Sequence, residues 1–455
     1  MSAPARRWLI LAHPFNMDGR AASHTITDKI PHLLTHGIEV VVISGVTGEK
    51  DTRFEHHQVW SAGPSGFKFE LRHVLRQKLK SKLAYRLIML TASLLLLPFI
   101  FLERLFKPVE SSWSWQFSAQ RLGRQLFRQK PFDLVYSTAG PFAAHLAAQT
   151  LKHQLGVPWL AEIHDPLVLP GTTPRTRRQL AYADVERQIC HDADIAIWFT
   201  DQAMASALAR HPVLGDRGRV MLPGVDDPFH GAALPPYVRR EHLIVGHFGS
   251  LSKSRTLLPF VHALALLKEE SPQAYADLRI HIYGGQLDEP SVQAAEALGV
   301  MAHINRFGRI ETDPLTGLSG RDQVLHRMRE CDALALVHGD DAMCAEYIPS
   351  KLYEYLWMQR PIIATVHDNP QMAKLLREQG HWVAEGPLQS GGSVKTAPEI
   401  AKLLHQLWQQ WRSSGLPDTG GITPYTTAAS TRQLIGWADK FISHSNGEKI
   451  RCIYF

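Results

Sequence analysis

Two glutamates, Glu346 and Glu354, stand with seven residues between them in the stretch C-A-E-Y-I-P-S-K-L-Y-E-Y-L-W-M-Q-R-P-I-I-A-T. Pro349 has the fixed φ of a first helical position, so we expect Glu346 in the loop before a helix and Glu354 inside it. The N–H groups of Ser350 and Lys351 would then be unsatisfied donors at a positive helix end, which suits phosphate oxygens. Carboxylates instead accept hydrogen bonds from sugar and ribose hydroxyls. The arrangement predicts a site that clamps a nucleotide sugar.

This stretch resembles the E-x7-E segment of retaining GT-B glycosyltransferases, most closely that of glycosyltransferase family 4. The residues that carry the resemblance are P-S-K-L-Y-E-Y-L and the following strand R-P-I-I-A-T. It implies a nucleoside-diphosphate sugar as donor, no further cofactor, and a front-face substitution in which the leaving phosphate helps to deprotonate the acceptor. It also implies that Glu346 holds hydroxyls of the donor sugar and that Glu354 holds the ribose. The alternative is an ordinary surface helix with Lys351 and Glu354 solvated.

Strands alternate with helices along the whole chain, which predicts a doubly wound α/β architecture with parallel sheets. In the first half the expected strands are Trp8–Ala12, Glu39–Ser44, Leu134–Ser137, Trp159–Ile163, Ile195–Phe199 and Val220–Leu222. In the second half they are Leu243–Phe248, Leu278–Tyr283, Ile304–Phe307, Ala333–Val337, Ile362–Thr365 and Trp382–Ala384. The two series predict two Rossmann-like domains whose strand-to-helix loops face a central cleft, which is the GT-B fold.

Residues that break helices and strands gather between Gly224 and Pro236, which predicts the domain boundary. We expect an acceptor-binding domain over 1–228 and a donor-binding domain over 237–426. A helical pattern over 427–443 closes the chain, and by the resemblance this last helix crosses back to the first domain.

The loop after the first strand contains Gly19, which permits close backbone approach, and Arg20, a cation at a helix start. It lacks G-x-G-x-x-G, which disfavours a dinucleotide cofactor. After the strand P-W-L-A-E-I, His164 and Asp165 match the family's position beside the reacting sugar, although Leu167 stands where one subgroup has Trp. The alternative for His164 is a structural role, hydrogen-bonded to its neighbours.

The loop G-S-L-S-K-S-R-T follows the first strand of the second half. Family 4 commonly has two cations here that hold the diphosphate, and the register of the following helix places Arg255 at one of these positions and Ser250 at the other. Lys253 is the candidate for the second cation, with a solvated loop lysine as the alternative. By the same resemblance, F-G-R-I places Arg309 beside the nucleobase.

No D-x-D motif in a metal-binding context is present, and the adjacent pairs Asp226-Asp227 and Asp340-Asp341 are typical of turns. The departing nucleoside diphosphate develops negative charge that the site must neutralise. We expect the helix start at Ser350–Lys351, with Arg255, to do so without a metal ion.

A basic segment and then an apolar segment occupy about 68–106. Seven cations and one acid, Glu70, lie between Lys68 and Arg86, and sixteen uncharged residues follow over 87–102. This is shorter than the ~20 apolar residues that span a bilayer, and Pro98 interrupts it. On one continuous helical wheel the leucines share an arc with most cations, an arrangement that snorkelling side chains accommodate. We expect an insertion that associates with an anionic membrane surface. The alternative is a buried helix with a basic flank.

The composition, 45% hydrophobic and 20% charged, is that of a soluble globular protein. The four cysteines lie far apart without metal-ligand spacing, which indicates a reducing compartment, and the first apolar run is only strand length, so no cleavable signal peptide is visible. We expect a cytoplasmic protein, peripheral on the inner face of the cytoplasmic membrane, with no nucleic-acid partner.

These observations together predict a retaining glycosyltransferase acting on a lipid-linked or saccharide acceptor in polysaccharide or lipopolysaccharide synthesis. Two alternatives remain open. A nucleotide-sugar epimerase of GT-B architecture would consume the nucleotide sugar without releasing a nucleoside diphosphate. A non-catalytic GT-B subunit that scaffolds a partner would bind the donor without turnover.

Overall fold

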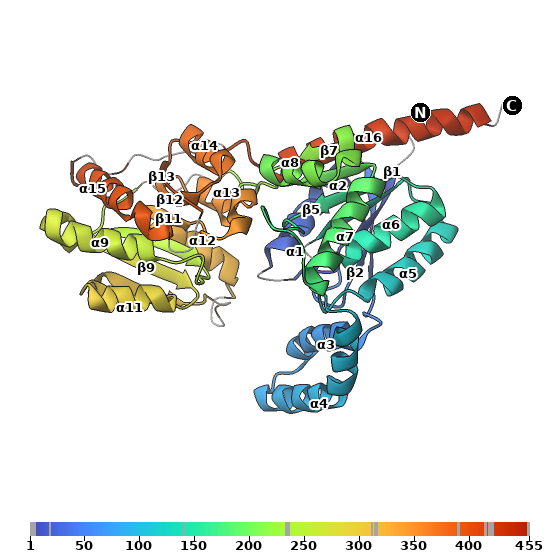
Figure 1. Cartoon of the computed structure of the whole chain (residues 1–455), viewed down its shortest axis with the longest axis horizontal. Coiled ribbons are helices and arrows are strands. Elements are labelled where there is room, and N and C mark those ends of the chain that lie inside the picture. Colours follow the sequence, from blue (N-terminus) through green and yellow to red (C-terminus); the bar gives the residue numbers. More distant parts are fainter. Residues whose placement is uncertain are drawn as a thin grey trace. The chain divides into compact units, whose positions relative to one another are not determined.

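The computed structural model of the chain describes residues 6–17, 20–139, 142–232, 237–310, 313, 317–388, 392–413, 416 and 423–452. It contains two compact units, each built on one parallel sheet (Figure 1). The N-terminal unit is Met1–Pro223 with Thr427–Phe455, and the C-terminal unit is Gly224–Thr426. The predicted GT-B class, two doubly wound α/β units, is confirmed.

The N-terminal sheet has the strand order β3-β2-β1-β4-β5-β6-β7, with all neighbours parallel. Its strands are β1 (Arg6–Leu11), β2 (Ile38–Ser44), β3 (Glu55–Gln58), β4 (Leu134–Ala139), β5 (Trp159–Ile163), β6 (Ile195–Trp198) and β7 (Gly218–Val220). Its helices are α1 (Ala21–Thr27), α2 (Ile30–Thr35), α3 (Pro64–Lys78), α4 (Lys82–Phe106), α5 (Trp115–Gln129), α6 (Ala143–Leu155), α7 (Arg177–Asp192), α8 (Asp201–Arg210) and α16 (Thr427–Cys452).

Successive side chains of β1 point to opposite faces of this sheet, and both faces are buried. Leu9 and Leu11 pack against helices α5 to α8, whereas Trp8 and Ile10 pack against α1, α2 and the start of α16. Both series are apolar because a parallel sheet covered on two sides has no solvent face. The helix α16 is also joined to the end of the first segment, since the Ser430 hydroxyl donates to the carbonyl of Pro223.

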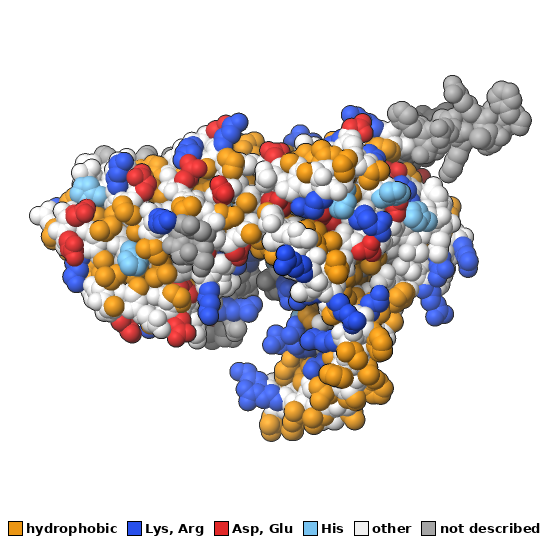
Figure 2. Space-filling model, viewed as in Figure 1, with side chains coloured by type: hydrophobic (Ala, Val, Ile, Leu, Met, Phe, Trp, Pro, Cys, Tyr) orange, Lys and Arg blue, Asp and Glu red, His pale blue; other side chains and the backbone are white. Residues whose placement is uncertain are grey.

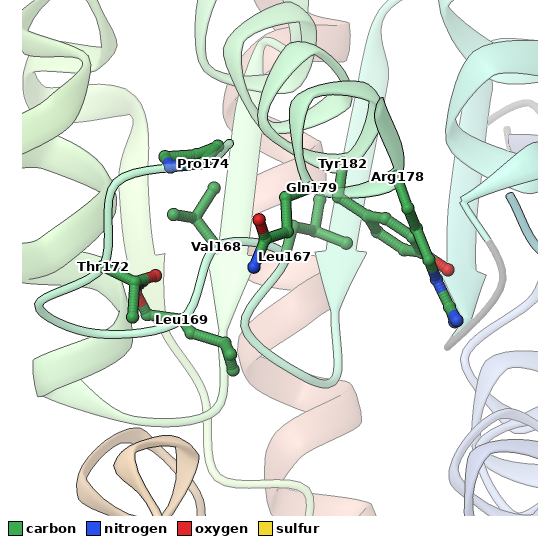
Figure 3. A pocket seen from close by; sticks show the side chains of 8 residues that line it. All are labelled: Leu167, Val168, Leu169, Thr172, Pro174, Arg178, Gln179 and Tyr182. Carbon is green, nitrogen blue, oxygen red and sulfur yellow. Dashed lines mark hydrogen bonds between the residues drawn. The ribbon is translucent and has the colours of Figure 1, made fainter. Parts of the chain in front are cut away.

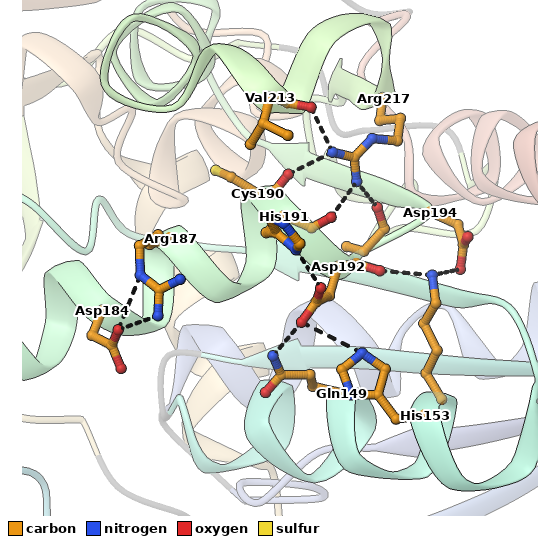
Figure 4. A network of polar contacts seen from close by, with 12 residues as sticks. Gln149, His153, Asp184, Arg187, Cys190, His191, Asp192, Asp194, Val213 and Arg217 are labelled. Carbon is orange, nitrogen blue, oxygen red and sulfur yellow. Dashed lines mark hydrogen bonds and ion pairs between the residues drawn. The ribbon is translucent and has the colours of Figure 1, made fainter.

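A polar network ties the outer strands to the helices beside them (Figure 4). The guanidinium of Arg217, just before β7, donates to the carbonyls of Cys190 and Val213 at 2.7 Å each. On α6, the Nζ of Lys152 donates to the carboxylate of Asp194 at 2.6 Å, and the same carboxylate accepts the N–H of Trp159 at the start of β5. These contacts fix the position of β5, which is followed by the candidate site residues His164 and Asp165.

The C-terminal sheet has the order β10-β9-β8-β11-β12-β13, again parallel throughout. Its strands are β8 (Leu243–Gly249), β9 (Leu278–Gly284), β10 (Ile304–Gly308), β11 (Ala333–Val337), β12 (Ile362–His367) and β13 (Trp382–Gly386). Its helices are α9 (Leu258–Glu270), α10 (Pro272–Asp277), α11 (Glu289–Ala297), α12 (Gly320–Glu330), α13 (Lys351–Leu356), α14 (Pro370–Glu378) and α15 (Ala397–Ser413). The helices α9, α11 and α15 bury one face of the sheet.

Helices α3 and α4 form a hairpin that projects from the N-terminal sheet, and apolar side chains gather on it beside cations (Figures 1 and 2). The chain breaks at Leu79–Ser81, so the expectation of one continuous helical wheel across both segments was wrong. All 25 residues of α4 are described and none is buried, which excludes the alternative of a core helix. The helix α4 extends beyond both ends of the uncharged run over 87–102. The Ser81 hydroxyl accepts the N–H of Ala84 and so caps its start, and charged residues are tolerated in its first and last turns.

Two buried or half-buried acids hold the base of this hairpin. Glu70 of α3 has no exposed surface and accepts hydrogen bonds from the N–H and hydroxyl of Ser61, with the Nε2 of His13 at 3.0 Å. Glu103 near the end of α4 accepts the N–H of Ser65 at 2.8 Å and the indole N–H of Trp113 at 2.6 Å. The only acid within the basic segment is therefore an anchor and not a surface charge.

Candidate active site

The Glu346–Glu354 segment forms the loop after β11 and the short helix α13. Glu346 ends a 3-10 turn (Ala342–Glu346) and is only 2% exposed, whereas the Glu354 side chain is a quarter exposed, 3.5 Å from Arg321 Nη2. The helix begins at Lys351 with Ser350 as N-cap, so the expectation that Pro349 is its first residue was wrong. Leu352 N–H already bonds to the carbonyl of Pro349, and α13 has six residues.

Two side chains that the sequence did not point to hold this loop. Asn369 Nδ2 donates to the carbonyls of Cys344 and Tyr347 at 3.0 Å each. The Nδ1 of His338 accepts the N–H of His367, which leaves its Nε2–H to donate to Tyr347 O at 3.1 Å. Burial lowers the pKa of His338 to about 4, so this tautomer stays neutral at pH 7. The loop conformation around Glu346 is thereby fixed.

Lys351 is turned inward against β8. Its Nζ donates to the carbonyl of Phe248 at 2.6 Å, and burial, followed by the charge of Arg255, lowers the pKa of Lys351 to about 7. Gly249 makes room for it, because a Cβ there would lie 2.5 Å from Nζ and φ is +123°. A β8 loop with glycine at this position and a cation buried beneath it is suited to diphosphate oxygens.

The loop after β8 carries the other predicted cations. Ser252 N–H bonds to Arg255 O, and Ser254 O accepts the N–H of Asp340, which joins this loop to the one after β11. Arg255 is half-buried and Lys253 is exposed. The structure thus places the charge of Arg255 where it adds to the effect of burial on the pKa of Lys351, and leaves Lys253 exposed.

Three aromatic rings stack across the carboxyl ends of β8, β9 and β10. Phe248 and Tyr283 lie 4.6 Å apart, and Tyr283 and Phe307 lie 4.7 Å apart, both nearly parallel. Phe307 is 53% exposed and is followed, after Gly308, by the exposed Arg309. The exposed outer ring offers a flat apolar face next to a cation.

In the N-terminal unit, His164 and Asp165 follow β5, and Asp165 is exposed. The Nε2 of His164 lies 2.9 Å from the hydroxyl of Thr138 and 3.0 Å from Oε1 of Glu162, and its ring stacks on Phe199 at 4.8 Å. Both the site role and the structural role predicted for His164 are compatible with these contacts. Arg20 is exposed before α1, and Gly19 lies outside the described residues.

Beneath His164 lies a fully buried polar cluster that the sequence reading missed. Glu162 accepts hydrogen bonds from Lys29 Nζ at 2.8 Å, from Tyr136 Oη at 2.7 Å and from Thr138 Oγ1 at 2.8 Å. Burial alone would raise the pKa of Glu162, but the charge of Lys29 and the bond from His164 hold it below its ordinary value. A glutamate inside the apolar strand W-L-A-E-I was the available signal.

The predicted residues therefore fall into two groups. Arg20, His164 and Asp165 belong to the N-terminal unit, and Lys253, Arg255, Arg309, Glu346, Ser350, Lys351 and Glu354 belong to the C-terminal unit. Within the described part of the chain, no group of three or more His, Cys, Asp or Glu side chains is placed to hold a metal ion. The cysteines Cys190, Cys331 and Cys344 are free and buried.

A family model described as Glycosyltransferase Family 4 matches residues 22–228. No curated protein matches the sequence significantly. Among solved structures, the chain is similar to sucrose-phosphate synthase from Thermosynechococcus elongatus, with 13% identity and a TM-score of 0.58 over 96% of this chain and 100% of that one. It is also similar to trehalose-6-phosphate from E. coli bound with UDP-2-fluoro glucose, with 11% identity and a TM-score of 0.51 over 90% and 98%.

A third similar structure is the lipopolysaccharide outer core galactosyltransferase WaaB, with 11% identity and a TM-score of 0.51 over 97% of this chain and 99% of that one. At such identities the structural likeness establishes the fold alone. The family model covers residues 22–228, so the N-terminal unit is similar to glycosyltransferase family 4, and the chain as a whole has the GT-B fold of these solved structures.

Proposed function

We propose that this protein is a retaining glycosyltransferase of family 4 that transfers a sugar from a nucleotide sugar to a lipid-linked saccharide acceptor at an anionic membrane surface, on the cytoplasmic side, in polysaccharide or lipopolysaccharide synthesis. The observation that carries the proposal is α4. Its leucines and phenylalanines face solvent, among them Leu94, Leu95 and Phe101 at 63–67% exposed. A contiguous apolar surface of this kind marks a contact with lipid or with another protein.

The geometry of the hairpin favours insertion into one leaflet. By length and composition α4 suffices to cross a bilayer. However, α3 packs along it and carries Lys68, Arg72 and Arg76, which a spanning α4 would draw into hydrocarbon at a high free-energy cost. Glu103 of α4 accepts the N–H of Ser65 in α3, which opposes separation of the two helices at their base, and Glu70 holds α3 to Ser61. An interfacial helix keeps these cations at the level of lipid head groups.

Cations between the end of α3 and the start of α4 supply the preference for anionic lipid. Arg76 and Lys78 in the last turn of α3 and Lys80 and Lys82 beyond it lie next to the apolar helix. Cations near an anionic surface contribute about 1 kcal/mol each, an attraction that salt screens. The apolar contribution of α4 is not screened, so high salt should weaken membrane binding without abolishing it.

On the donor side, we assign the diphosphate to Arg255 and Lys351, with Lys253 and the Ser350 end of α13 contributing. Glu354 holds the ribose, Glu346 holds hydroxyls of the donor sugar, and Arg309 lies beside the nucleobase. The buried position of Lys351 and its contact with a carbonyl support this assignment, because a diphosphate offers a stronger acceptor for the same ammonium. These charges neutralise the leaving group without a metal ion.

On the acceptor side, His164 and Asp165 contact the reacting sugar or the acceptor, and Gly19 and Arg20 approach the donor diphosphate. Support for His164 comes from its fixed ring, held by Thr138 and by Phe199 at the ligand edge of β5. The names of the similar structures include both lipopolysaccharide and small-sugar enzymes, so the choice of acceptor rests on α4 and not on them.

Vesicle binding of the full chain tests the membrane contact. We expect tighter binding to vesicles of phosphatidylglycerol and phosphatidylcholine than to phosphatidylcholine alone. Replacing Arg76, Lys78, Lys80 and Lys82 by Gln should remove this preference. The matched control replaces four exposed cations of the C-terminal unit by Gln, namely Arg327, Lys374, Arg377 and Lys402. Equal, negligible binding to both vesicle types by a monomeric protein would overturn the proposal.

Transfer itself is tested by screening nucleotide sugars by thermal shift, because a bound ligand stabilises the folded state. The donor that stabilises is then offered lipid-linked and free saccharides in vesicles. Radiolabel in the lipid fraction together with release of a nucleoside diphosphate supports the proposal. Sugar interconversion without that release identifies an epimerase, and transfer to free saccharides alone removes the lipid-linked acceptor.

A further inference from the structure

An open pocket of about 100 Å³ lies in the N-terminal unit between the loop after β5 and the start of α7 (Figure 3). Leu167, Val168 and Pro174 form apolar walls, and Arg178 and Tyr182 lie side by side across from them. The pocket is at the carboxyl end of β5, the edge where parallel sheets bind ligands. It is separate from the residues assigned above to the donor.

Arg178 brings a positive charge to this pocket. Its guanidinium lies 5.7 Å from the centre of the Tyr182 ring, which in turn packs edge-on against Phe142 at 5.2 Å. Among the described residues no carboxylate lies within ion-pair distance of Arg178. The acid that influences it is Glu110, which accepts the N–H of Ala143; burial raises the pKa of Glu110 to about 8, so this carboxyl is neutral at pH 7. The guanidinium also interacts with the Tyr182 side chain, and its other donors are available to an anionic ligand.

The pocket also adjoins the apolar hairpin. Arg177, the neighbour of Arg178 at the start of α7, donates from Nη1 to the carbonyl of Leu105 at 3.2 Å. Leu105 and Phe106, in the last turn of α4, are 52% and 76% exposed. The start of α7, which carries Arg178, is therefore in contact with the last turn of α4.

We propose that this pocket binds the phosphate of a phosphate-linked lipid acceptor, with Arg178 on the phosphate and the last turn of α4 against the adjoining part of the chain. A guanidinium forms paired hydrogen bonds to phosphate oxygens, and the neighbouring ring and apolar walls suit the junction between phosphate and chain. The inference rests on the proposed function, since it presupposes a lipid-linked acceptor. It adds the phosphate linkage and the residue that recognises it.

The decisive variant is Arg178→Gln in the full chain. We expect the KM for a lipid-phosphate-linked acceptor to rise at least roughly tenfold, because a charged hydrogen bond is lost, with the KM for the nucleotide sugar unchanged. The matched control is Arg187→Gln, on the same helix α7, 58% exposed and paired with Asp184 outside the pocket. Tyr182→Phe keeps the ring and should bind as the wild type. Thermal unfolding of each variant checks that it is folded.

Direct binding separates the sources of the phosphate. The probes are geranyl phosphate, geraniol and inorganic phosphate. Because the proposed donor site also accepts phosphate, the contribution of the pocket to affinity is taken as the difference in affinity between Arg178→Gln and Arg187→Gln. We expect Arg178→Gln to weaken geranyl phosphate at least roughly tenfold and to leave geraniol unaffected. The inference is overturned if Arg178→Gln loses equal affinity for inorganic phosphate and geranyl phosphate, and if the wild type binds geranyl phosphate no more tightly than inorganic phosphate. That result would indicate a site for free anions.

The two proposals fail in different ways. If the wild type transfers sugar to a phosphate-linked lipid and Arg178→Gln does so with the same KM as Arg187→Gln, the pocket assignment is wrong and the proposed function stands. If the wild type neither binds vesicles nor transfers sugar to any lipid-linked acceptor, the proposed function is wrong and the pocket assignment falls with it.

Discussion

The Nζ of Lys29 lies 2.8 Å from Oε2 of Glu162, and neither side chain has exposed surface. Lys29 precedes α2, and Glu162 is in β5, so the ion pair joins a helix start to the strand that presents His164. The carboxylate also accepts hydrogen bonds from Tyr136 and Thr138. A buried pair in such a network is costly to break on one side only, because the remaining charge is left without a partner.

We therefore expect Lys29→Met to lower the free energy of unfolding by about 3–5 kcal/mol. Adding Glu162→Gln should recover part of that loss, since the stranded charge is removed with it. Urea denaturation of the single and double variants measures both effects. The control is Arg187→Met, whose pair with Asp184 is more than half exposed on both sides and should cost under about 1 kcal/mol. A loss of that small size for Lys29→Met would contradict the network's role.

Glu354→Ala should raise the dissociation constant of the nucleotide sugar roughly 10–100-fold, because a charged hydrogen bond to the ribose is lost. The fold should remain intact, since the side chain is a quarter exposed and its contact with Arg321 is long. Calorimetric titration measures the affinity. Glu378→Ala on α14, with its side chain 55% exposed, is the control. Unchanged donor affinity in Glu354→Ala would remove the ribose assignment.

Glu346→Ala should lower kcat more than it weakens donor binding, because contacts to the reacting sugar act mainly in the transition state. Steady-state kinetics together with direct donor titration separates the two effects. Asn369→Ala offers a comparison, since it loosens the loop without touching the carboxylate. A wild-type kcat in Glu346→Ala would exclude the contact with the sugar.

Donor affinity should fall as pH rises through about 7, the pKa to which burial and Arg255 bring Lys351. In the proposed assignment the protonated ammonium of Lys351 binds the diphosphate, so we expect donor binding to be roughly tenfold or more tighter at pH 6 than at pH 9. In the ligand-free protein the pKa of Lys351 is about 7 in the folded state and 10.5 in the unfolded state. Between these two pH values the unfolded state binds one more proton, so the free energy of unfolding rises with pH. Lys351→Met should bind the donor weakly and without this pH dependence. Titration with a nucleotide sugar at several pH values is the measurement, and an identical slope in Lys351→Met would refute the assignment.

Activity should survive chelation. Arg255 and Lys351 provide the charge that a divalent cation would otherwise provide, so the rate of transfer after dialysis against EDTA should stay within about twofold of the untreated rate. Complete loss of activity that Mg²⁺ or Mn²⁺ restores would show that the enzyme requires a metal.

Most strands could be predicted from the sequence because parallel strands buried on both faces are continuous apolar runs. Trp159–Ile163 and Ala333–Val337 have the predicted bounds, and the others differ by a few residues at their ends. The exception is β3, Glu55–Gln58, an edge strand whose polar side chains carry no apolar signal. Residue propensity and hydropathy do not predict β3, because this strand is held by backbone pairing with β2.

The candidate site residues could be predicted where a family motif marks them, but the contacts that tertiary packing gives them could not. Glu346, Glu354 and Lys351 follow from the motif, but the inward turn of Lys351 depends on Gly249, about a hundred residues earlier. Likewise Lys29 and Glu162 are 133 residues apart, and no local pattern links them. The hairpin shows the same limit, because the buried state of Glu70 depends on His13 and Ser61.

The contact between Lys351 Nζ and Phe248 O gives the cation of the proposed donor site a partner within the protein. Under this assignment, a diphosphate that binds replaces the carbonyl as the partner of the ammonium, and the carbonyl accepts the ammonium again when the nucleotide leaves. Release of the nucleotide would then leave no unpaired charge that water must solvate.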